Sequence, residues 1–360
     1  MIRPGTAPDP LQIAVIRGDG IGPELVSSAL EVLDAVASAQ GFDVEVREEP
    51  GGADHYRTTG QPLGEGALAH LRAVDGVLKG PVGLPQVRRP DGTEGGVLGG
   101  VMRTGLDTYA NVRPVRLLPG VEGATRHEPG DIDYVIVREN TEGLYLSRGA
   151  GVATRDAACD QMLITRRGVE RVSRFALDLA RTRAGAPLDG VRRVTCVDKS
   201  NVLRSFALFR KVFDEVATGY PDVATDHLYA DAAAHALVVE PSRFDVLVME
   251  NFLGDILSDL GAATVGGLGM CPSGNIGDDS AYFEPIHGSA PTIAARDLAN
   301  PVSQILSLAM LLSHSGHTEA AARVSRAVEA AFSDGEVRLL RNGSPERGTR
   351  SVTAAVVERL

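Results

Sequence analysis

The stretch Phe244-Asp-Val-Leu-Val-Met-Glu-Asn-Phe-Leu-Gly-Asp-Ile-Leu-Ser-Asp-Leu-Gly261 joins an apolar strand directly to a helix that carries two carboxylates. Asp255 and Asp259 stand four residues apart and therefore share one helical face. Two aspartates at this spacing also fit the solvated stripe of an amphipathic helix. Here, however, leucines and an isoleucine fill the other face, and Gly254 leaves room for a ligand to approach the backbone. Because like charges repel and hard oxygen ligands prefer Mg²⁺ or Mn²⁺, the stretch predicts a divalent-metal site.

Segments that predict strands alternate with segments that predict helices along most of the chain. The expected strands are residues 11–17, Val44–Arg47, Gly76–Lys79, Tyr134–Arg138, Arg193–Val197 and Phe244–Met249. The expected helices are residues 25–39, Arg166–Arg183, Val202–Thr218, Ala232–Glu240, Asn300–Ser315 and Thr318–Ser333. This alternation predicts an α/β fold with a largely parallel sheet. Three Gly- and Pro-rich segments, residues 79–100, 118–130 and 266–277, are expected to be long loops.

Length and composition narrow the class of protein. The 360 residues suggest two domains, and a formal charge of −11 argues against a nucleic-acid partner. No apolar run reaches the roughly 20 residues that cross a bilayer, and the N-terminus lacks a signal pattern, so we expect a cytoplasmic protein without a membrane partner. The three cysteines are too widely spaced for a zinc knuckle.

Four further clusters carry groups suited to chemistry. Arg103, Arg113 and Arg138 could supply planar forks for carboxylates, although each arginine taken alone is more typical of a surface ion pair. Lys199, one of only three lysines, follows a predicted strand. Asp231 begins an apolar helix, where it would serve as a cap. The last cluster is the polar loop His287-Gly-Ser-Ala-Pro291, which could approach a nucleotide.

Together and in this order, these segments resemble the β-decarboxylating dehydrogenases, the family of isocitrate, homoisocitrate, isopropylmalate, tartrate and D-malate dehydrogenases. The resemblance covers residues 11–335 and is strongest to the isocitrate and homoisocitrate enzymes. It implies an isopropylmalate dehydrogenase-like two-domain fold. Residues 1–108 together with residues 267–360 would form a discontinuous cofactor-side domain, and residues 109–266 would form the substrate, metal and dimerisation domain.

The resemblance also implies a role for each cluster. Arg103, Arg113 and Arg138 match the substrate-binding arginines, and Asp255 and Asp259 match metal ligands. Asp231 matches a third metal ligand from the partner subunit, and Lys199, also from the partner, matches the acceptor of the hydroxyl proton. Tyr145 matches the acid that protonates C3 of the enol. The implied assembly is a homodimer with shared active sites, and the implied reaction is metal-dependent oxidative decarboxylation of a hydroxy acid.

For the cofactor, the matching positions are Asn201, His287, Gly288, Ser289, Ala290, Thr292 and Asn300. NAD-using relatives usually have Asp after the His-Gly-Ser-Ala-Pro run, and NADP-using bacterial isocitrate enzymes have Lys-Tyr. This chain has Thr292, which can bond a ribose hydroxyl but carries no cation for a 2′-phosphate. The residues favour NAD and leave NADP open.

The C3 substituent of the substrate is recognised in this family just before the first arginine. Isocitrate enzymes have Ser and Asn there, isopropylmalate enzymes leucines, and homoisocitrate enzymes arginine. This chain has Val97, Gly99 and Gly100, which disfavours isopropylmalate, and Arg88-Arg89 could reach an acidic substituent. We therefore expect an isocitrate- or homoisocitrate-like substrate. Tartrate, D-malate, 3-isopropylmalate and a phosphonomethylmalate remain alternatives, as do a catalytically silent regulatory subunit and a binding protein for metal–citrate-like anions.

Overall fold

The computed structural model describes residues 7–147 and 150–360, and the chain divides into two compact units. Unit 1 comprises the residues up to Asp107, residues 118–122 and residues 265–360. Unit 2 comprises residues 108–117 and 123–264. These boundaries lie within two residues of the expected ones, except for the short segment 118–122. Which unit serves the cofactor and which the metal stays a prediction.

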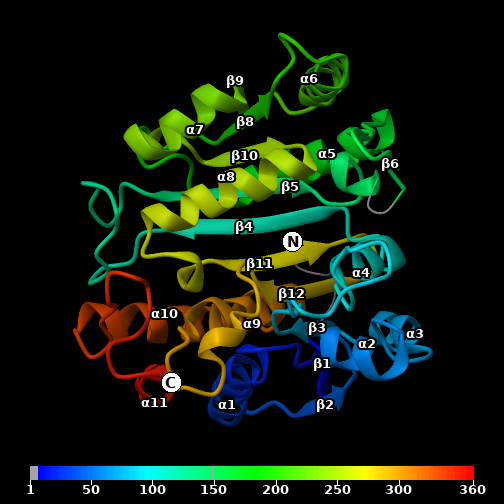
Figure 1. Cartoon of the computed structure of the whole chain (residues 1–360). Helices are drawn as coiled ribbons and strands as arrows, with labels where there is room; N and C mark the ends of the chain where they lie inside the picture. Colours follow the sequence, from blue (N-terminus) through cyan, green and yellow to red (C-terminus); the bar gives the residue numbers. More distant parts are fainter. Residues whose placement is uncertain (1–6, 148–149) are drawn as a thin grey trace. The chain divides into compact units, whose positions relative to one another are not determined.

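Unit 1 is an α/β unit, and its elements can be followed by their labels in Figure 1. Its strands are β1 (Leu11–Ile16), β2 (Val44–Glu48), β3 (Gly76–Lys79), β11 (Pro272–Ile276) and β12 (Ala281–Pro285), in the spatial order β2-β1-β3-β12-β11. Three of these four pairings are parallel, and β11 pairs with β12 antiparallel. The helices are α1 (Gly22–Gln40), α2 (Ala53–Thr59), α3 (Ala67–Ala73), α4 (Gly99–Gly105), α9 (Val302–His314), α10 (Thr318–Ser333) and α11 (Thr349–Val357).

Both faces of the unit 1 strands are covered, which explains why β1 is apolar along most of its length. Ala14 and Ile16 pack with residues of α3 and α4, such as Leu71 and Met102, on one face. Helix α9 packs against β3, β11 and β12, and α1 and α10 pack against α9. Continuous burial of this kind is typical of parallel strands.

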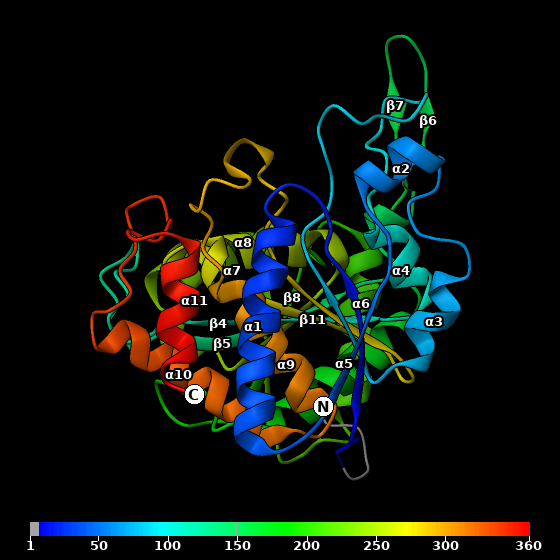
Figure 2. The same cartoon turned by 90° about the horizontal axis from the view of Figure 1, so that it is seen from below.

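Unit 2 repeats this architecture with its own strands. They are β4 (Ala110–Arg116), β5 (Asp133–Glu139), β8 (Arg193–Asp198), β9 (Ala224–Tyr229) and β10 (Val246–Met249), in the order β4-β5-β10-β8-β9. Only β4 and β5 pair antiparallel among these. Helices α7 (Ala230–Val239) and α8 (Asn251–Thr264) lie on one face, and α5 (Arg166–Thr182) lies on the other, packed against α6 (Arg204–Ala217) (Figures 1 and 2). A hairpin of β6 (Val152–Ala153) and β7 (Ala158–Cys159) completes the unit.

The predicted α/β fold with a largely parallel sheet is confirmed, whereas several polar strands were not expected. Strand β11 lies inside the segment expected to be a loop, because pairing with β12 buries even its Ser273 and Asn275. Strand β9 contains no buried residue and carries Asp226 and His227, so it lacks the apolar pattern of a buried strand. Edge and antiparallel strands depend on their neighbours more than on their own composition.

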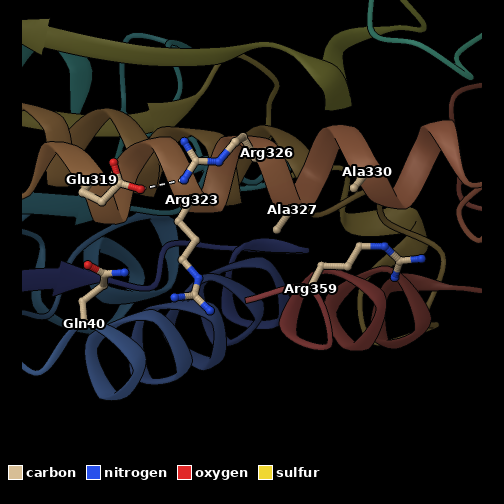
Figure 3. A pocket seen from close by; sticks show the side chains of 7 residues that line it. All are labelled: Gln40, Glu319, Arg323, Arg326, Ala327, Ala330 and Arg359. Carbon is tan, nitrogen blue, oxygen red and sulfur yellow. Dashed lines mark hydrogen bonds and ion pairs between the residues drawn. The ribbon is translucent and has the colours of Figure 1, made fainter.

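The surface of unit 1 carries a groove of about 440 Å³ between α1, α10 and α11 (Figure 3). It is lined by Gln40, Glu319, Arg323, Arg326, Ala327, Ala330 and Arg359. Arg326 pairs with Glu319 at 2.6 Å, and Arg359 lies 3.2 Å from Asp334, so two of its three arginines already have carboxylate partners. None of the residues with a predicted role lines it. Within the described ranges, no helix combines the length and apolarity needed to cross a membrane.

Candidate active site

Asp255, on α8, contacts three of the side chains that the sequence predicts for the site. Its carboxylate accepts hydrogen bonds from Tyr145 Oη, at 2.8 Å, and from Arg138 Nη1. Arg113 Nη2 lies 3.6 Å from the same carboxylate. One turn later, Asp259 lies 3.5 Å from Arg113 Nη1. The structure therefore brings together Arg113, Arg138, Tyr145, Asp255 and Asp259 in unit 2.

Arg138 is positioned by the end of β5, and its side chain is buried. Its Nε and Nη2 donate to Asn251 Oδ1 at 3.0 and 2.7 Å, and the ring of Tyr145 lies 5.6 Å from the guanidinium carbon. A Cβ at position 254 would come within 2.6 Å of the Arg138 stem. We expected Gly254 to admit a ligand. The structure shows instead that it admits Arg138.

Arg113 is held in a similar way from β4. Its Nε donates to Asn111 Oδ1 at 2.7 Å, and its Nη1 donates to Ser258 Oγ at 2.6 Å. Amide and hydroxyl oxygens thus orient both guanidinium groups, which also form ion pairs with the carboxylates of α8. Both arginines stay charged and oriented, which suits them to recognise carboxylates.

The two carboxylates of α8 fit a divalent cation. The pKa of Asp259 is raised, mainly because burial withdraws water from the charged form, and also because Asp255 is close; Arg113 and Arg138 oppose this shift. A bound cation would relieve the repulsion, and carboxylate oxygens are the donors that Mg²⁺ and Mn²⁺ prefer. Among the residues described, no three His, Cys, Asp or Glu side chains form a metal-binding group.

Lys199 and Asp231 pair with each other on an accessible part of unit 2. Lys199 follows β8, and its Nζ donates to Asp231 Oδ1 at 2.5 Å. The pKa of Asp231 is lowered, mainly by this hydrogen bond. The Asp231 side chain is 73% exposed, and Asn201 is also exposed. Both members of the pair are therefore accessible to another molecule.

The loop that follows β12 carries the predicted cofactor residues of unit 1 and is held mainly through its main chain. The Ser289 carbonyl accepts the Ile21 N–H at 2.8 Å, and Ser289 Oγ donates to the Gly83 carbonyl. A Cβ on Gly20 would come within 2.0 Å of the Ser289 carbonyl oxygen, so glycine is required there. Ala290 has a φ of 35°, in the left-handed region that alanine rarely adopts.

His287 and Asn300 bracket this loop. The pKa of His287 is lowered, mainly by burial and also by the charge of Lys79, which forms a buried ion pair with Glu284 at 2.5 Å. Gly288 follows it, and its carbonyl lies 3.0 Å from His287 Nδ1. Asn300 Oδ1 accepts the Val302 N–H at 3.1 Å at the start of α9. The loop thus presents the partly exposed imidazole of His287 between two ordered elements.

Two more residues with a predicted role, Thr292 and Arg103, belong to unit 1. Thr292 is exposed, and its carbonyl lies 3.4 Å from Arg296 Nη1. Arg103 lies on α4 and is partly buried. Of the three positions that were compared with relatives for recognition of the C3 substituent, Val97 and Gly99 are partly buried, whereas Gly100 is exposed.

Residues 12–356 match the family model described as isocitrate/isopropylmalate dehydrogenase. The chain belongs to this family. It is 42% identical to the 3-isopropylmalate dehydrogenase of Clavibacter michiganensis, over 98% of this chain and 99% of the relative. It is 43% identical to the enzyme of that name from Corynebacterium glutamicum, over 89% and 92%. The crystal structure of isocitrate dehydrogenase from Methylococcus capsulatus matches with a TM-score of 0.85 and 37% identity, over 97% and 98%.

Membership of the isocitrate/isopropylmalate dehydrogenase family confirms the predicted enzyme class. The chain is a decarboxylating dehydrogenase, an oxidoreductase of a family that typically uses NAD and a divalent metal. The relatives compared by sequence are named for 3-isopropylmalate, and the solved structure is named for isocitrate. The family alone therefore leaves the substituent at C3 open.

Sequence reasoning missed the residues that hold the site of this dehydrogenase in place. Asn111, Asn251 and Ser258 fix the two arginines, and Glu250 binds backbone amides beside Tyr145. Only Glu250-Asn251 carried a usable signal, because a polar pair between an apolar strand and a helix predicts a helix cap. Arg296 was missed because only Thr292, four residues earlier, was compared with the cofactor-binding residues of relatives.

Proposed function

We propose that this chain is an NAD-linked, divalent-metal-dependent oxidative decarboxylase of a 3-substituted D-malate. The observation that carries the proposal is Asp255, which contacts a buried arginine and a tyrosine hydroxyl at once. Such an arrangement places an anion-binding group, a metal-ligating group and a proton donor around one point. Oxidation at C2 followed by loss of the C3 carboxylate needs these three groups together.

Arg113 and Arg138, with Arg103 from unit 1, would bind the carboxylates of the substrate. Because Asn251 and Asn111 hold the two unit 2 guanidiniums independently of Asp255, both can stay in place when Asp255 turns to a metal. Bound carboxylates would fix which bond to C3 breaks. Orientation of this kind is a large share of catalysis.

The metal would be held by Asp255, Asp259 and Asp231 of the partner subunit. When bound, the metal would act as a Lewis acid on the oxygen at C2. The closeness of Asp255 and Asp259, which both lie within 4 Å of Arg113 on one face of α8, supports a cation held by these two carboxylates.

Proton transfers fall to two side chains. Lys199, contributed by the neighbouring subunit, would accept the proton of the C2 hydroxyl as hydride leaves for the nicotinamide. Tyr145 would return a proton to C3 after carbon dioxide departs, and its hydroxyl already points at Asp255. Both roles are general acid–base catalysis by positioned groups.

A homodimer formed through unit 2 would supply the shared residues. Exposed apolar side chains gather on the elements around Lys199 and α8. They are Val202, Leu203, Tyr229, Val238, Val239, Phe252 and Ile256. Apolar residues of this size on one unit favour a subunit interface.

NAD is the proposed cofactor, bound by the loop from His287 to Asn300. Thr292 is exposed and can meet a ribose hydroxyl. Arg296 is the cation that would bind a 2′-phosphate if the enzyme took NADP.

Replacement of Arg296 by Ala should leave NAD turnover within about threefold of wild type, since a single exposed contact contributes little. A large loss of NADP turnover in this variant, with NADP the better cofactor of wild type, would overturn the choice of NAD.

We propose a polar or acidic C3 substituent, as in isocitrate or homoisocitrate. Val97, Gly99 and Gly100 offer no leucine side chain to cover an isopropyl group. The second candidate is 3-isopropylmalate, which the names of the 42–43% identical relatives favour. Turnover against isocitrate, homoisocitrate, 3-isopropylmalate, tartrate, D-malate and phosphonomethylmalate, each with both nicotinamides and Mn²⁺, decides between them.

A matched variant sharpens this test. A Cβ at Gly99 would lie 3.7 Å from the Arg103 side chain, an ordinary contact, so Gly99→Leu with Gly100→Leu should fold. The pair should raise the kcat/KM ratio for 3-isopropylmalate over isocitrate by about 10-fold or more, because burying an isopropyl group gains a few kcal/mol. Preference of the unmodified enzyme for 3-isopropylmalate would refute the polar substituent.

A further inference from the structure

Glu250 is a buried carboxylate at the junction of β10 and α8. The residue directly follows Met249, the last residue of β10, and only about 1% of its surface is exposed. One oxygen, Oε2, accepts the N–H groups of Phe252 and Leu253 at 2.9 and 3.2 Å. The other, Oε1, accepts the Leu144 N–H at 3.3 Å. A single side chain thus joins the start of α8 to the turn that carries Tyr145.

This carboxylate accepts its hydrogen bonds from backbone amides. Across the described ranges, no Lys, Arg or His forms an ion pair with Glu250, so the charge rests on N–H groups and the positive end of α8. The fit on the other side is tight, because a Cβ at Gly143 would come within 2.1 Å of Glu250 Oε1. Gly143, with a φ of 81°, is therefore needed for Leu144 to reach the carboxylate.

The two ends of this bridge flank a predicted catalytic contact. Leu144 precedes Tyr145, whose hydroxyl donates to Asp255 on α8. Phe252, whose N–H binds Glu250, also packs edge-on against the Tyr145 ring, with centroids 5.9 Å apart. Glu250 fixes the backbone on both sides of the Tyr145–Asp255 hydrogen bond.

We propose that Glu250 is a positioning residue that holds Tyr145 against the metal-ligating helix for proton transfer to C3. This role rests on the proposed function. A carboxylate is needed because both oxygens must accept. In Glu250→Gln, one oxygen becomes an NH₂ group that faces backbone N–H donors, so one half of the bridge is lost. In Glu250→Asp, a carboxylate remains near α8 but is one methylene too short to reach Leu144.

The test compares these variants with a buried carboxylate at the other end of the same strand. Asp245 precedes β10, is fully buried and accepts from Arg183 Nε at 2.6 Å and from the Arg193 N–H at 3.1 Å. Asp245→Asn therefore controls for loss of a buried carboxylate next to β10 without touching Tyr145. Steady-state kinetics of the full-length enzyme with Mn²⁺ use the best acid and nicotinamide of the turnover panel.

We expect Glu250→Gln and Glu250→Asp to lower kcat by roughly 10- to 100-fold with KM changed less than about threefold, because small misplacements of a reacting group have effects of this size. Asp245→Asn should lower the melting temperature while kcat of the folded enzyme stays within about threefold of wild type. In a Tyr145→Phe background, the Glu250 substitutions should lower kcat by less than about threefold, since a residue that acts through Tyr145 loses its effect when the hydroxyl is gone.

Equal losses from the Glu250 substitutions with and without the Tyr145 hydroxyl would overturn this role, as would full activity of both Glu250 variants. Amide hydrogen exchange gives a readout that needs no turnover. Exchange should accelerate at Leu144 in both variants, and unchanged protection there would count against the bridge. A wild-type enzyme inactive on every acid would overturn the proposed function, and this role with it, whereas an active wild type with active Glu250 variants overturns the role alone.

Discussion

The two units hold their predicted functional groups in different ways. In unit 2, the predicted groups are held by hydrogen bonds between side chains. Asn251 accepts from Arg138, Asp255 accepts from Tyr145, and Ser258 accepts from Arg113. In unit 1, the loop after β12 is held mostly by main-chain carbonyls and amides, such as those of Ser289 and Ile21. Substitutions in unit 2 should therefore change the chemistry directly. Substitutions around the unit 1 loop should act through where the backbone lies.

Each unit also contains a buried carboxylate that binds backbone amides. Glu250 does so in unit 2, and Asp19 does so in unit 1, where it accepts the N–H groups of Ala53, Asp54 and Gly83 at 2.8, 3.0 and 2.8 Å. Gly83 in turn accepts from Ser289. The two carboxylates make the contrast testable, because the same chemical change can be made in both units.

The largest effect is expected from Asp255→Asn. Loss of the proposed metal-ligating carboxylate, which also accepts a hydrogen bond from Tyr145, should lower kcat by about 1,000-fold or more, since metal and electrostatic stabilisation supply several kcal/mol. Mn²⁺ affinity, followed by isothermal titration, should fall as well. Asp222→Asn, which removes an exposed carboxylate paired with Arg181 at 2.5 Å, is the control and should keep wild-type activity. Activity retained by the Asp255 variant would contradict the expectation that substitutions in unit 2 change the chemistry directly.

Lys199→Met should come next, with kcat lowered by about 100-fold or more and substrate affinity little changed, because a proton acceptor is lost. A subunit-mixing experiment tests whether the lysine crosses the interface. Refolding Lys199→Met chains with Asp255→Asn chains should recover about a quarter of wild-type activity, since half the dimers would be mixed and each would hold one intact site. Equal inactivity of mixed and unmixed samples would place both residues in one chain's site.

A smaller effect is expected from Asp19→Asn. Its amide cannot accept three backbone N–H groups equally well, so the unfolding free energy should fall by about 1–3 kcal/mol. The Gly83–Ser289 contact should loosen, which would raise the NAD dissociation constant several-fold, while kcat at saturating NAD should stay near wild type. The measurements are urea unfolding and fluorescence titration with NADH. A drop in kcat equal to that of the Glu250 variants would erase the distinction between the units.

The smallest effect concerns pH. Because burial and Lys79 lower the pKa of His287, the unfolded chain binds a proton more readily than the folded chain. Stability should therefore be lost as pH falls below about 6.5, the ordinary histidine value, and be unaffected by this group at higher pH. Urea unfolding between pH 5 and 8 should show a steeper acid loss for wild type than for His287→Gln. Parallel curves for the two proteins would show that His287 carries no such penalty.

The fold was predictable where each segment carries its own signal. The expected strand Gly76–Lys79 and helix Thr318–Ser333 match β3 and α10, and α1 extends the expected helix at its start through Gly22 and Pro23. Proline tolerated at a helix start explains that extension. Strands β9 and β11 were missed because neighbours, not composition, make them strands.

For the site, the sequence predicted the chemical groups but not what holds them. The spacing of Asp255 and Asp259 predicted that both share one face of α8, and the structure shows that both lie beside Arg113, which the spacing did not indicate. No local pattern could indicate that Asn251 would meet Arg138 across 113 positions of chain. Contacts of that separation depend on how strands are ordered in the sheet, which spacing does not encode.

Strand β10 has a further mechanical consequence. Its four apolar residues, Val246–Met249, are bracketed by Asp245 and Glu250, both buried and both anchored by hydrogen bonds. Sliding by one residue, about 3.3 Å, would drag a carboxylate into the apolar layer and strip it of its partners. The register of β10 is therefore fixed at both ends. Any rearrangement during turnover must move whole elements relative to the strand rather than shift its register.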